Sequence, residues 1–383
     1  MTGRFDHLPD RRAIVDRRAL ADRIATLPDP IPAKIAPLLR DALDAGRAEI
    51  ARRLAEHPAR GLEAAGAQAY LVDQLLRLLL DSAQRLYPEA EPIALVAVGG
   101  YGRAEMAAHS DVDLAFLTAA SPSALAQRVV EAVLYALWDM RLKIGHSVRS
   151  LDEMVQQARG DMTIRTAMLE ARLVAGSEAV WIAAERRFQT EVRRGTERAF
   201  VADKLVERDA RHRRMGDTRY VVEPNVKEGK GGLRDLHTLF WIGKYVYDVG
   251  RARQLVDEGL FTPAEYRLFH RADEFFWAVR CHLHVLTGRA EDRLTFDVQR
   301  EIAARMRFRD RAGKSAVERF MQYYFLQARA VGTLSGVFLA HLDERFAARG
   351  RRFGLPTIRR KPGKLHGFVL DRGRLALPRD GFF

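Results

Sequence analysis

The pattern of apolar positions divides the chain into a helical beginning, a short mixed segment and a long helical end. Residues 11–90 are dominated by Ala, Arg and Leu, and apolar side chains recur at helical spacing over residues 71–87. Pro88 and Pro92 mark the end of this pattern, because proline interrupts regular structure. We therefore expect an N-terminal helical region over residues 1–90.

The pattern changes at Ile93. Residues 93–98, IALVAV, form a short apolar run that ends at a pair of glycines, which is typical of a buried strand. The pattern then predicts a strand over 111–117, a helix over 121–140 capped by Ser121 or Ser123, a strand over 142–150, and a passage from helix to strand over 166–176. Residues 91–178 are therefore expected to form a small mixed α/β domain.

Helical patterns dominate again in the second half of the chain. They cover residues 178–192, 233–249, 262–286 and 314–346, which predicts a helical domain over 179–346. The remaining basic tail, residues 347–383, is rich in Gly, Pro and Arg and contains a predicted hairpin within 364–377. The expected class is α+β, with a small mixed sheet flanked by N-terminal helices and a C-terminal helical domain.

Composition narrows the class of protein. The chain has 383 residues, of which 48% are hydrophobic, so it can bury sizeable cores. No apolar run approaches the roughly 18–20 residues of a membrane span, and the N-terminus lacks the apolar stretch of a signal peptide. The lone cysteine, Cys281, excludes an internal disulfide. We expect a cytoplasmic protein with no membrane partner.

The net charge of +13 favours anionic ligands, although a solvated basic face explains it equally well. Nucleic acid is not an expected partner, because no module with interleaved basic and aromatic residues is visible.

Candidate chemistry begins at Gly99 and Gly100, which follow the first predicted strand. Glycines adopt positive φ and let backbone N–H groups approach a ligand closely. A turn of this kind that leads into a helix favours phosphate. The segment lacks the patterns of a Walker A loop and of a Rossmann fingerprint.

A carboxylate pair follows about ten residues later. Asp111 and Asp113 are two positions apart on a predicted strand, so their side chains point to the same face. Two carboxylates on one face repel each other unless a cation lies between them, and Mg²⁺ prefers such oxygen ligands. Two such ions can hold the attacking and leaving oxygens of a phosphoryl transfer. Ser110 either caps the strand entry or binds a phosphate oxygen.

Residues 99–117, GGYGRAEMAAHSDVDLAFL, resemble the catalytic motif of the DNA polymerase β-like nucleotidyltransferase superfamily. Two further segments resemble the bifunctional PII uridylyltransferase/uridylyl-removing family more narrowly. They are residues 220–245, with E-P-N-x-K and G-G-L-R-D-x-H, and residues 280–299. The resemblance covers residues 70–345 and implies a polymerase β-like sheet.

This resemblance implies a reaction. Enzymes of the family transfer UMP from UTP to a tyrosine hydroxyl of the signalling protein PII, with Mg²⁺, and release pyrophosphate. By matching position, Gly99 and Gly100 would hold the UTP phosphates, and Asp111 and Asp113 would bind the metal ions. Arg103 belongs to the same glycine motif and is expected to contact the nucleotide.

The second motif supplies further candidates for phosphate or nucleotide contact, namely Lys227, Lys230 and Arg234. The alternative is a tight inter-domain turn with Asp235 as a helix cap. Asn225 and His237 are expected to contact substrate or to pin the loop, and we favour pinning for His237. The third motif is expected to form an ion-paired scaffold of Arg280, His284, Asp292 and Asp297.

A third catalytic carboxylate, which the superfamily usually places on a neighbouring strand, is missing from residues 142–150. Glu170 is the best substitute, and Asp161 and Asp152 are weaker ones. Arg149 is expected to assist with triphosphate charge.

The full-length family continues into an HD-type hydrolase domain and two ACT domains. The sequence contains no His-Asp dipeptide, so we expect a fragment or truncated product that retains only the transferase half. The alternatives are adenylylation of a protein, another nucleotidyl transfer, or a non-catalytic protein that binds nucleotide or PII.

Overall fold

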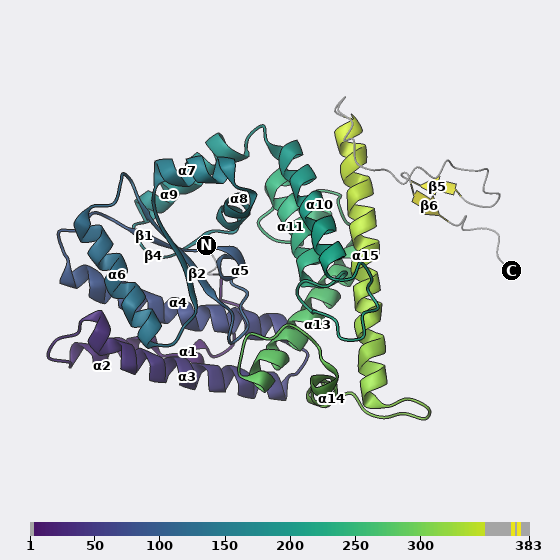
Figure 1. Ribbon diagram of the computed structural model, residues 1–383, viewed down its shortest axis with the longest axis horizontal. Coiled ribbons are helices and arrows are strands. Elements are labelled where there is room, and N and C mark those ends of the chain that lie inside the picture. Colours follow the sequence, from purple (N-terminus) through teal and green to yellow (C-terminus); the bar gives the residue numbers. More distant parts are fainter. Residues whose placement is uncertain (1–3, 349–368, 372–373, 377–383) are drawn as a thin grey trace.

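The computed structural model describes residues 4–348, 369–371 and 374–376 (Figure 1). Most of the predicted basic tail lies outside these residues. The hairpin predicted within it is confirmed, since β5 (Val369–Asp371) pairs antiparallel with β6 (Arg374–Ala376). No helix in the described ranges has the length and apolar character to cross a membrane.

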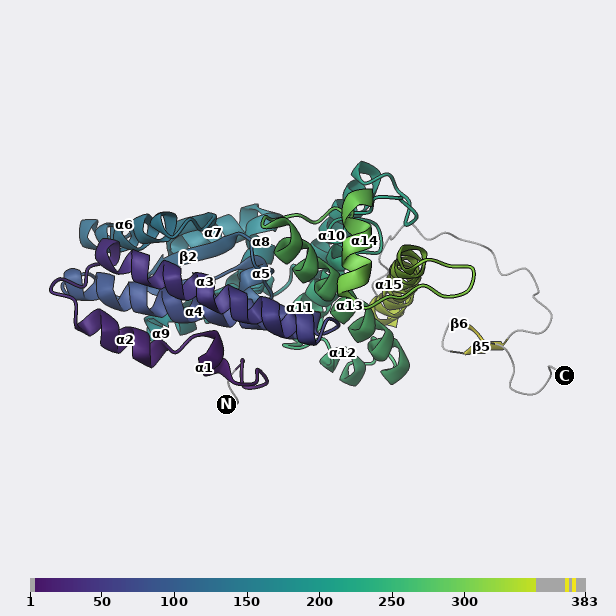
Figure 2. The same cartoon turned by 90° about the horizontal axis from the view of Figure 1, so that it is seen from below.

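The N-terminal region is helical, as predicted. It consists of α1 (Arg11–Ile14), α2 (Arg17–Ala25), α3 (Pro32–Glu56) and α4 (Gly61–Leu86). Asp16 caps α2 by accepting hydrogen bonds from two backbone N–H groups, and Pro32 occupies the first turn of α3, where no N–H partner is required. The long helices α3 and α4 lie side by side (Figures 1 and 2).

A four-stranded sheet follows in the order β3-β2-β1-β4. Its strands are β1 (Ala94–Ala97), β2 (Val112–Thr118), β3 (Ile144–Ser150) and β4 (Arg172–Gly176). β1 is antiparallel to β2 and β4, while β2 and β3 are parallel. The sheet is therefore mixed, as predicted. The parallel pair needs a crossover, and α6 (Ala124–Asp139), capped by Ser123, supplies it.

The alternation of side chains along β2 decides which residues face which layer. Leu114 and Phe116 belong to the core shared with α3, α4 and α6. Ala115 and Leu117 belong to a second core on the opposite face. That core includes side chains of α7 (Leu151–Gly160), α8 (Met162–Leu169) and α9 (Glu178–Arg187). Asp113 shares the second face by period-two spacing.

The C-terminal part is helical. A short π-helix, η1 (Phe188–Arg193), leads into it, followed by α10 (Glu197–Arg214), α11 (Leu233–Tyr247), α12 (Gln254–Asp257), α13 (Pro263–Thr287), α14 (Phe296–Arg305) and α15 (Ala316–Ala348). α13 packs against both α4 and α15, so it joins the N-terminal helices to the C-terminal ones. One apolar core continues from the N-terminal helices into α15.

Candidate active site

The strand ends bring the glycine turn to the carboxylate pair. β1 leads into α5 (Gly99–Gly102), and β2 starts beside it, because the Val98 N–H donates to the Asp113 carbonyl at 3.0 Å. Gly99 has φ of +59°, a region that favours glycine, and a Cβ there would lie 3.6 Å from Asp113 Oδ2. Gly99 and Asp113, which the sequence predicts to lie near each other, are thus within contact distance.

Gly145 makes room for the Asp113 carboxylate. It lies opposite Asp113 on the parallel strand β3, and a Cβ added there would lie 2.3 Å from Asp113 Oδ1. A side chain at 145 would therefore displace the carboxylate. The superfamily usually carries its third catalytic carboxylate on a strand in this position. In this chain β3 carries Gly145 opposite Asp113, and the glycine leaves space for the Asp113 carboxylate.

The two aspartates differ in environment. Asp111 is exposed and directly precedes β2, while Asp113 is half-buried within the strand. Burial raises the pKa of Asp113, and the negative charge of Asp111 raises it further. The pair is thus a place where added positive charge is favourable.

The residues present fit a magnesium ion. Mg²⁺ is usually held by one or two carboxylates together with substrate phosphates and water, and this pair with the adjacent glycine turn offers that donor set. No group of three or more His, Cys, Asp or Glu side chains with metal-binding geometry occurs in the part of the chain that the structure describes.

Lys227 of the second motif acts on this pair through its charge. Its positive charge lowers the pKa of Asp113, opposing the effect of burial. The loop that carries it is shaped by Asn225, whose side-chain oxygen accepts hydrogen bonds from the Lys227 N–H at 3.0 Å and the Glu228 N–H at 2.6 Å. Asn225 thus pins the loop.

The third motif supports the second. Arg280 and His284, both on α13, contact Asp292 Oδ1 at 2.7 and 3.4 Å. The Asp292 carbonyl accepts from the Val226 N–H at 2.8 Å, next to Lys227. These contacts form the expected ion-paired scaffold. Asp297 lies in the first turn of α14, and no ion pair of its side chain is found among the described residues.

The same scaffold reaches the first motif. The His109 N–H donates to His284 Nδ1 at 3.3 Å, and the two rings stack at 6.3 Å. His109 lies two positions before Asp111. Segments far apart in the sequence therefore converge beside the carboxylate pair.

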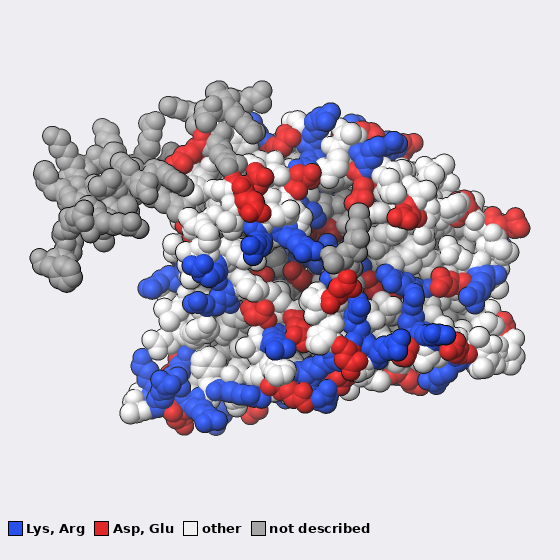
Figure 3. Space-filling model, turned by 180° about the vertical axis from the view of Figure 1, so that it is seen from behind, with Lys and Arg blue, Asp and Glu red and all other residues white. Residues whose placement is uncertain are grey.

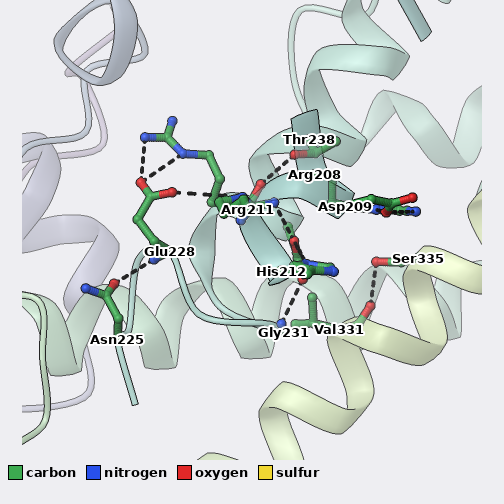
Figure 4. A network of polar contacts seen from close by, with 12 residues as sticks. Arg208, Asp209, Arg211, His212, Asn225, Glu228, Gly231, Thr238, Val331 and Ser335 are labelled. Carbon is green, nitrogen blue, oxygen red and sulfur yellow. Dashed lines mark hydrogen bonds and ion pairs between the residues drawn. The ribbon is translucent and has the colours of Figure 1, made fainter. Parts of the chain in front are cut away.

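A buried network holds the start of α11 (Figure 4). Asp235 accepts from Arg211 at 2.7 Å, from His212 at 2.8 Å and from the Gly231 N–H at 2.7 Å. Gly231 has φ of +84° and packs against the backbone of Ala328 on α15. This part of the second motif therefore forms a tight turn, and Asp235 in the first turn of α11 accepts a hydrogen bond from its backbone.

Lys230 and Arg234 contact acidic side chains of the protein. Lys230 pairs with Asp217 at 2.6 Å, and Arg234 pairs with Glu228 at 2.9 Å while lying over the Trp241 ring. Both bases therefore fasten the loop that presents Lys227.

Glu170 and Arg103 form an enclosed ion-pair cluster. The Glu170 carboxylate is fully buried and contacts Arg103 at 3.0 Å and Lys244 at 3.5 Å. Arg103 is only 7% exposed, pairs also with Glu105 at 2.9 Å, and lies against His237. Arg103 and Lys244 therefore hold the Glu170 carboxylate in an ion-paired cluster, while its Oε1 has no hydrogen-bond partner among the described residues. His237 is pinned in this cluster.

The remaining candidates have other partners. Ser110 Oγ accepts from the Ala107 N–H at 3.0 Å and so shapes the turn before β2. Asp161 caps α8, and Asp152 pairs with Arg187. Arg149 lies on β3 four positions beyond Gly145, which places it about 13 Å along the strand.

Beneath the turn lies a network that sequence reasoning missed. The buried Tyr101 hydroxyl donates to Asp73 Oδ1 at 2.8 Å, and Arg172 contacts Asp73 Oδ2 at 2.6 Å. Arg172 also donates to the Tyr101 carbonyl at 3.3 Å. This network fixes α5 to α4 and β4. The only signal in the sequence was an aromatic residue enclosed between glycines.

Residues 46–167, which include the glycine turn and the aspartate pair, match the family model described as putative nucleotidyltransferase DUF294. Residues 199–339 match the model described as GlnD PII-uridylyltransferase. Over 97–98% of its length the chain is 57%, 53% and 48% identical to the bifunctional uridylyltransferase/uridylyl-removing enzymes of Novosphingobium aromaticivorans, Erythrobacter litoralis and Rhodospirillum rubrum. Over nearly its whole length the chain is therefore similar to these enzymes. It spans 41–42% of the length of these relatives.

Proposed function

We propose that this chain transfers UMP from UTP to a tyrosine hydroxyl of the nitrogen-regulatory protein PII and releases pyrophosphate. The observation that carries the proposal is the close approach of Gly99 to Asp113, which lies beside the second carboxylate, Asp111. The relatives' names supply the uridylyl group and the family model's description supplies PII. The place of reaction would be the cytoplasm, where nucleoside triphosphates are available.

In this proposal Asp111 and Asp113 would hold two Mg²⁺ ions. Bound there, the ions would supply positive charge that balances the triphosphate and the charge that develops around the α-phosphorus. The backbone at Gly99 and Gly100 lets the phosphates approach the sheet edge. Lys227 adds positive charge on the side of the C-terminal helices.

The chemical step forms one bond and breaks one. The tyrosine oxygen bonds to the α-phosphorus of UTP, the bond from that phosphorus to the bridging oxygen breaks, and pyrophosphate leaves in line. The phenolic proton passes to solvent. The chain's residues position the two substrates and balance charge, so no covalent intermediate with the enzyme is required.

In this proposal the other candidate residues hold the glycine turn and the loop of Lys227 in place. Arg103 and Glu170 brace the turn from below, and Lys230 and Arg234 hold the loop of Lys227. Ser110 shapes the approach to β2. Direct contact with the nucleotide is assigned to the glycine turn and Lys227.

Intact-mass spectrometry of PII tests the proposal. Purified PII is incubated with the chain, Mg²⁺ and 2-oxoglutarate, in parallel with UTP, with ATP, with both, or with neither. A mass gain of one UMP that requires UTP is the expected result. A folded chain that adds AMP instead, or adds nothing under any of these conditions, would overturn the proposal.

A further inference from the structure

A separate cavity lies between the N-terminal segment, α11 and α13. Its volume is about 680 Å³, within the range of small-molecule sites. Neither carboxylate of the Asp111 and Asp113 pair lines it, nor does Lys227. Figure 3 shows one face of the molecule, which has a hollow near its middle with acidic atoms inside it and basic side chains around it. We call it the α11–α13 cavity.

Basic side chains surround this cavity. Arg4, Lys244 and Arg251 line it, and Lys244 pairs with Glu170 at 3.5 Å. Desolvation lowers the pKa of Arg4, and the positive charges of Arg172 and Arg251 lower it further, while Glu170 and Glu105 act in the opposite direction. Within the described residues, no hydrogen bond or ion pair engages the exposed Arg251 side chain.

Two of the acids that line the cavity pair with bases. Glu105 is paired with Arg103, and Asp6 is paired with Arg11. Asp273 also lines the cavity, and its Oδ1 is buried without a hydrogen-bond partner among the described residues. Burial and the charge of Glu105 raise the pKa of Asp273 well above its usual range.

The cavity also has an apolar side. Phe240 and Phe269 line it together with Ala252. A volume of this size exceeds what an inorganic anion fills, and aromatic walls favour a ligand with an apolar part.

We propose that the α11–α13 cavity binds a small organic anion. Its charged group, a phosphate or a carboxylate, lies between Arg4, Arg251 and Lys244. Its apolar part packs against Phe240 and Phe269.

The position of Arg4 joins this cavity to the glycine turn. Its guanidinium donates to the carbonyls of Gly102 at 3.4 Å and Arg103 at 2.9 Å, at the end of α5. A ligand that draws Arg4 toward the cavity therefore acts on the segment that carries Gly99 and Gly100. The inference concerns a site outside the proposed transfer chemistry and does not depend on it.

Isothermal titration calorimetry in EDTA, on the whole chain, tests the proposal with inorganic phosphate, UMP and citrate as probes. UMP or citrate should bind at least about tenfold more tightly than phosphate, because each fills more of the cavity. Tighter binding of UMP identifies a phosphate ligand, and tighter binding of citrate identifies a carboxylate ligand.

Variants locate the binding. Arg251→Gln should weaken binding of the tighter probe by about tenfold or more, since a charge-assisted hydrogen bond is lost. Its matched control, Arg253→Gln, changes an exposed neighbour that does not line the cavity and should leave affinity unchanged. No saturable binding by any probe, or binding that Arg251→Gln leaves intact, would overturn the proposal.

Discussion

At the scale of single residues, the position of the Asp113 carboxylate depends on the space that Gly145 leaves for it. If Asp113 holds the metal ion as proposed, Gly145→Ala should lower the rate of transfer by about tenfold to a hundredfold, because the added Cβ displaces the Asp113 carboxylate. The rate of UMP incorporation into PII measures the effect. Gly160→Ala is the matched control, since nothing lies within 4 Å of a Cβ there. Equal rates for both variants would contradict the arrangement at the carboxylate pair.

Binding of Mg²⁺ at Asp113 should raise the thermal stability of the folded chain. Its folded-state pKa is raised, so the ionised carboxylate disfavours the native state at neutral pH when no cation is bound. Asp113→Asn should therefore not lower the melting temperature in EDTA. Mg²⁺ should raise the melting temperature of the unaltered chain and have little effect on the variant. Scanning calorimetry with and without Mg²⁺ decides this, and an equal Mg²⁺ effect on both proteins would place the metal elsewhere.

At the scale of elements, the start of α11 depends on Asp235. Asp235→Ala leaves the buried guanidinium of Arg211 without its closest partner, and such a loss costs about 3–5 kcal/mol of unfolding free energy. Urea unfolding followed by circular dichroism measures it. In Asp209→Ala the pair lost is partly exposed, so the cost should stay below about 1 kcal/mol. Similar losses in the two variants would mean that the network does not hold the loop.

The elements also show what the sequence could predict. The strands from Ala94 and from Val112 and the capped helix after Ser123 follow from short apolar runs and cap residues, which act locally. α10 was not predicted as an element, because most of its positions are charged and only a few, such as Phe200 and Val201, face the core. Local pattern carries no information on a helix stabilised mainly by such tertiary contacts.

The candidate site could be predicted only in part for the same reason. The spacing of Asp111 and Asp113 after the glycine turn suffices to place them together, since the connection is short. The enclosure of Glu170 by Arg103 and Lys244 depends on how β4 and α11 pack, and no spacing along the chain encodes it. The effect of the Lys227 charge on Asp113 likewise depends on how the chain folds, so the sequence alone does not predict it.

At the scale of the whole molecule, buried histidines predict sensitivity to acid. Burial lowers the pKa of His237, His282 and His284, that of His282 to about 4. A folded pKa below the unfolded value means that stability is complete above about pH 6.5 and is lost as pH falls toward 4. His282 alone should contribute a loss of about 1.4 kcal/mol per pH unit in this window.

Urea unfolding at pH 7.5 and pH 5 measures this loss. His282→Gln removes the titrating ring and should make the decline with pH shallower. A free energy of unfolding that stays constant or rises between these two pH values would contradict the burial of these neutral rings.

The central claim is that the Asp111 and Asp113 pair performs nucleotidyl transfer. The most direct test compares the rate of UMP incorporation into PII by the unaltered chain, by Asp111→Asn/Asp113→Asn, and by Asp139→Asn, which changes an exposed aspartate at the end of α6. Circular dichroism confirms that each variant is folded. The account predicts that the double variant transfers no UMP while Asp139→Asn matches the unaltered chain. A folded double variant that transfers UMP at the unaltered rate would contradict it.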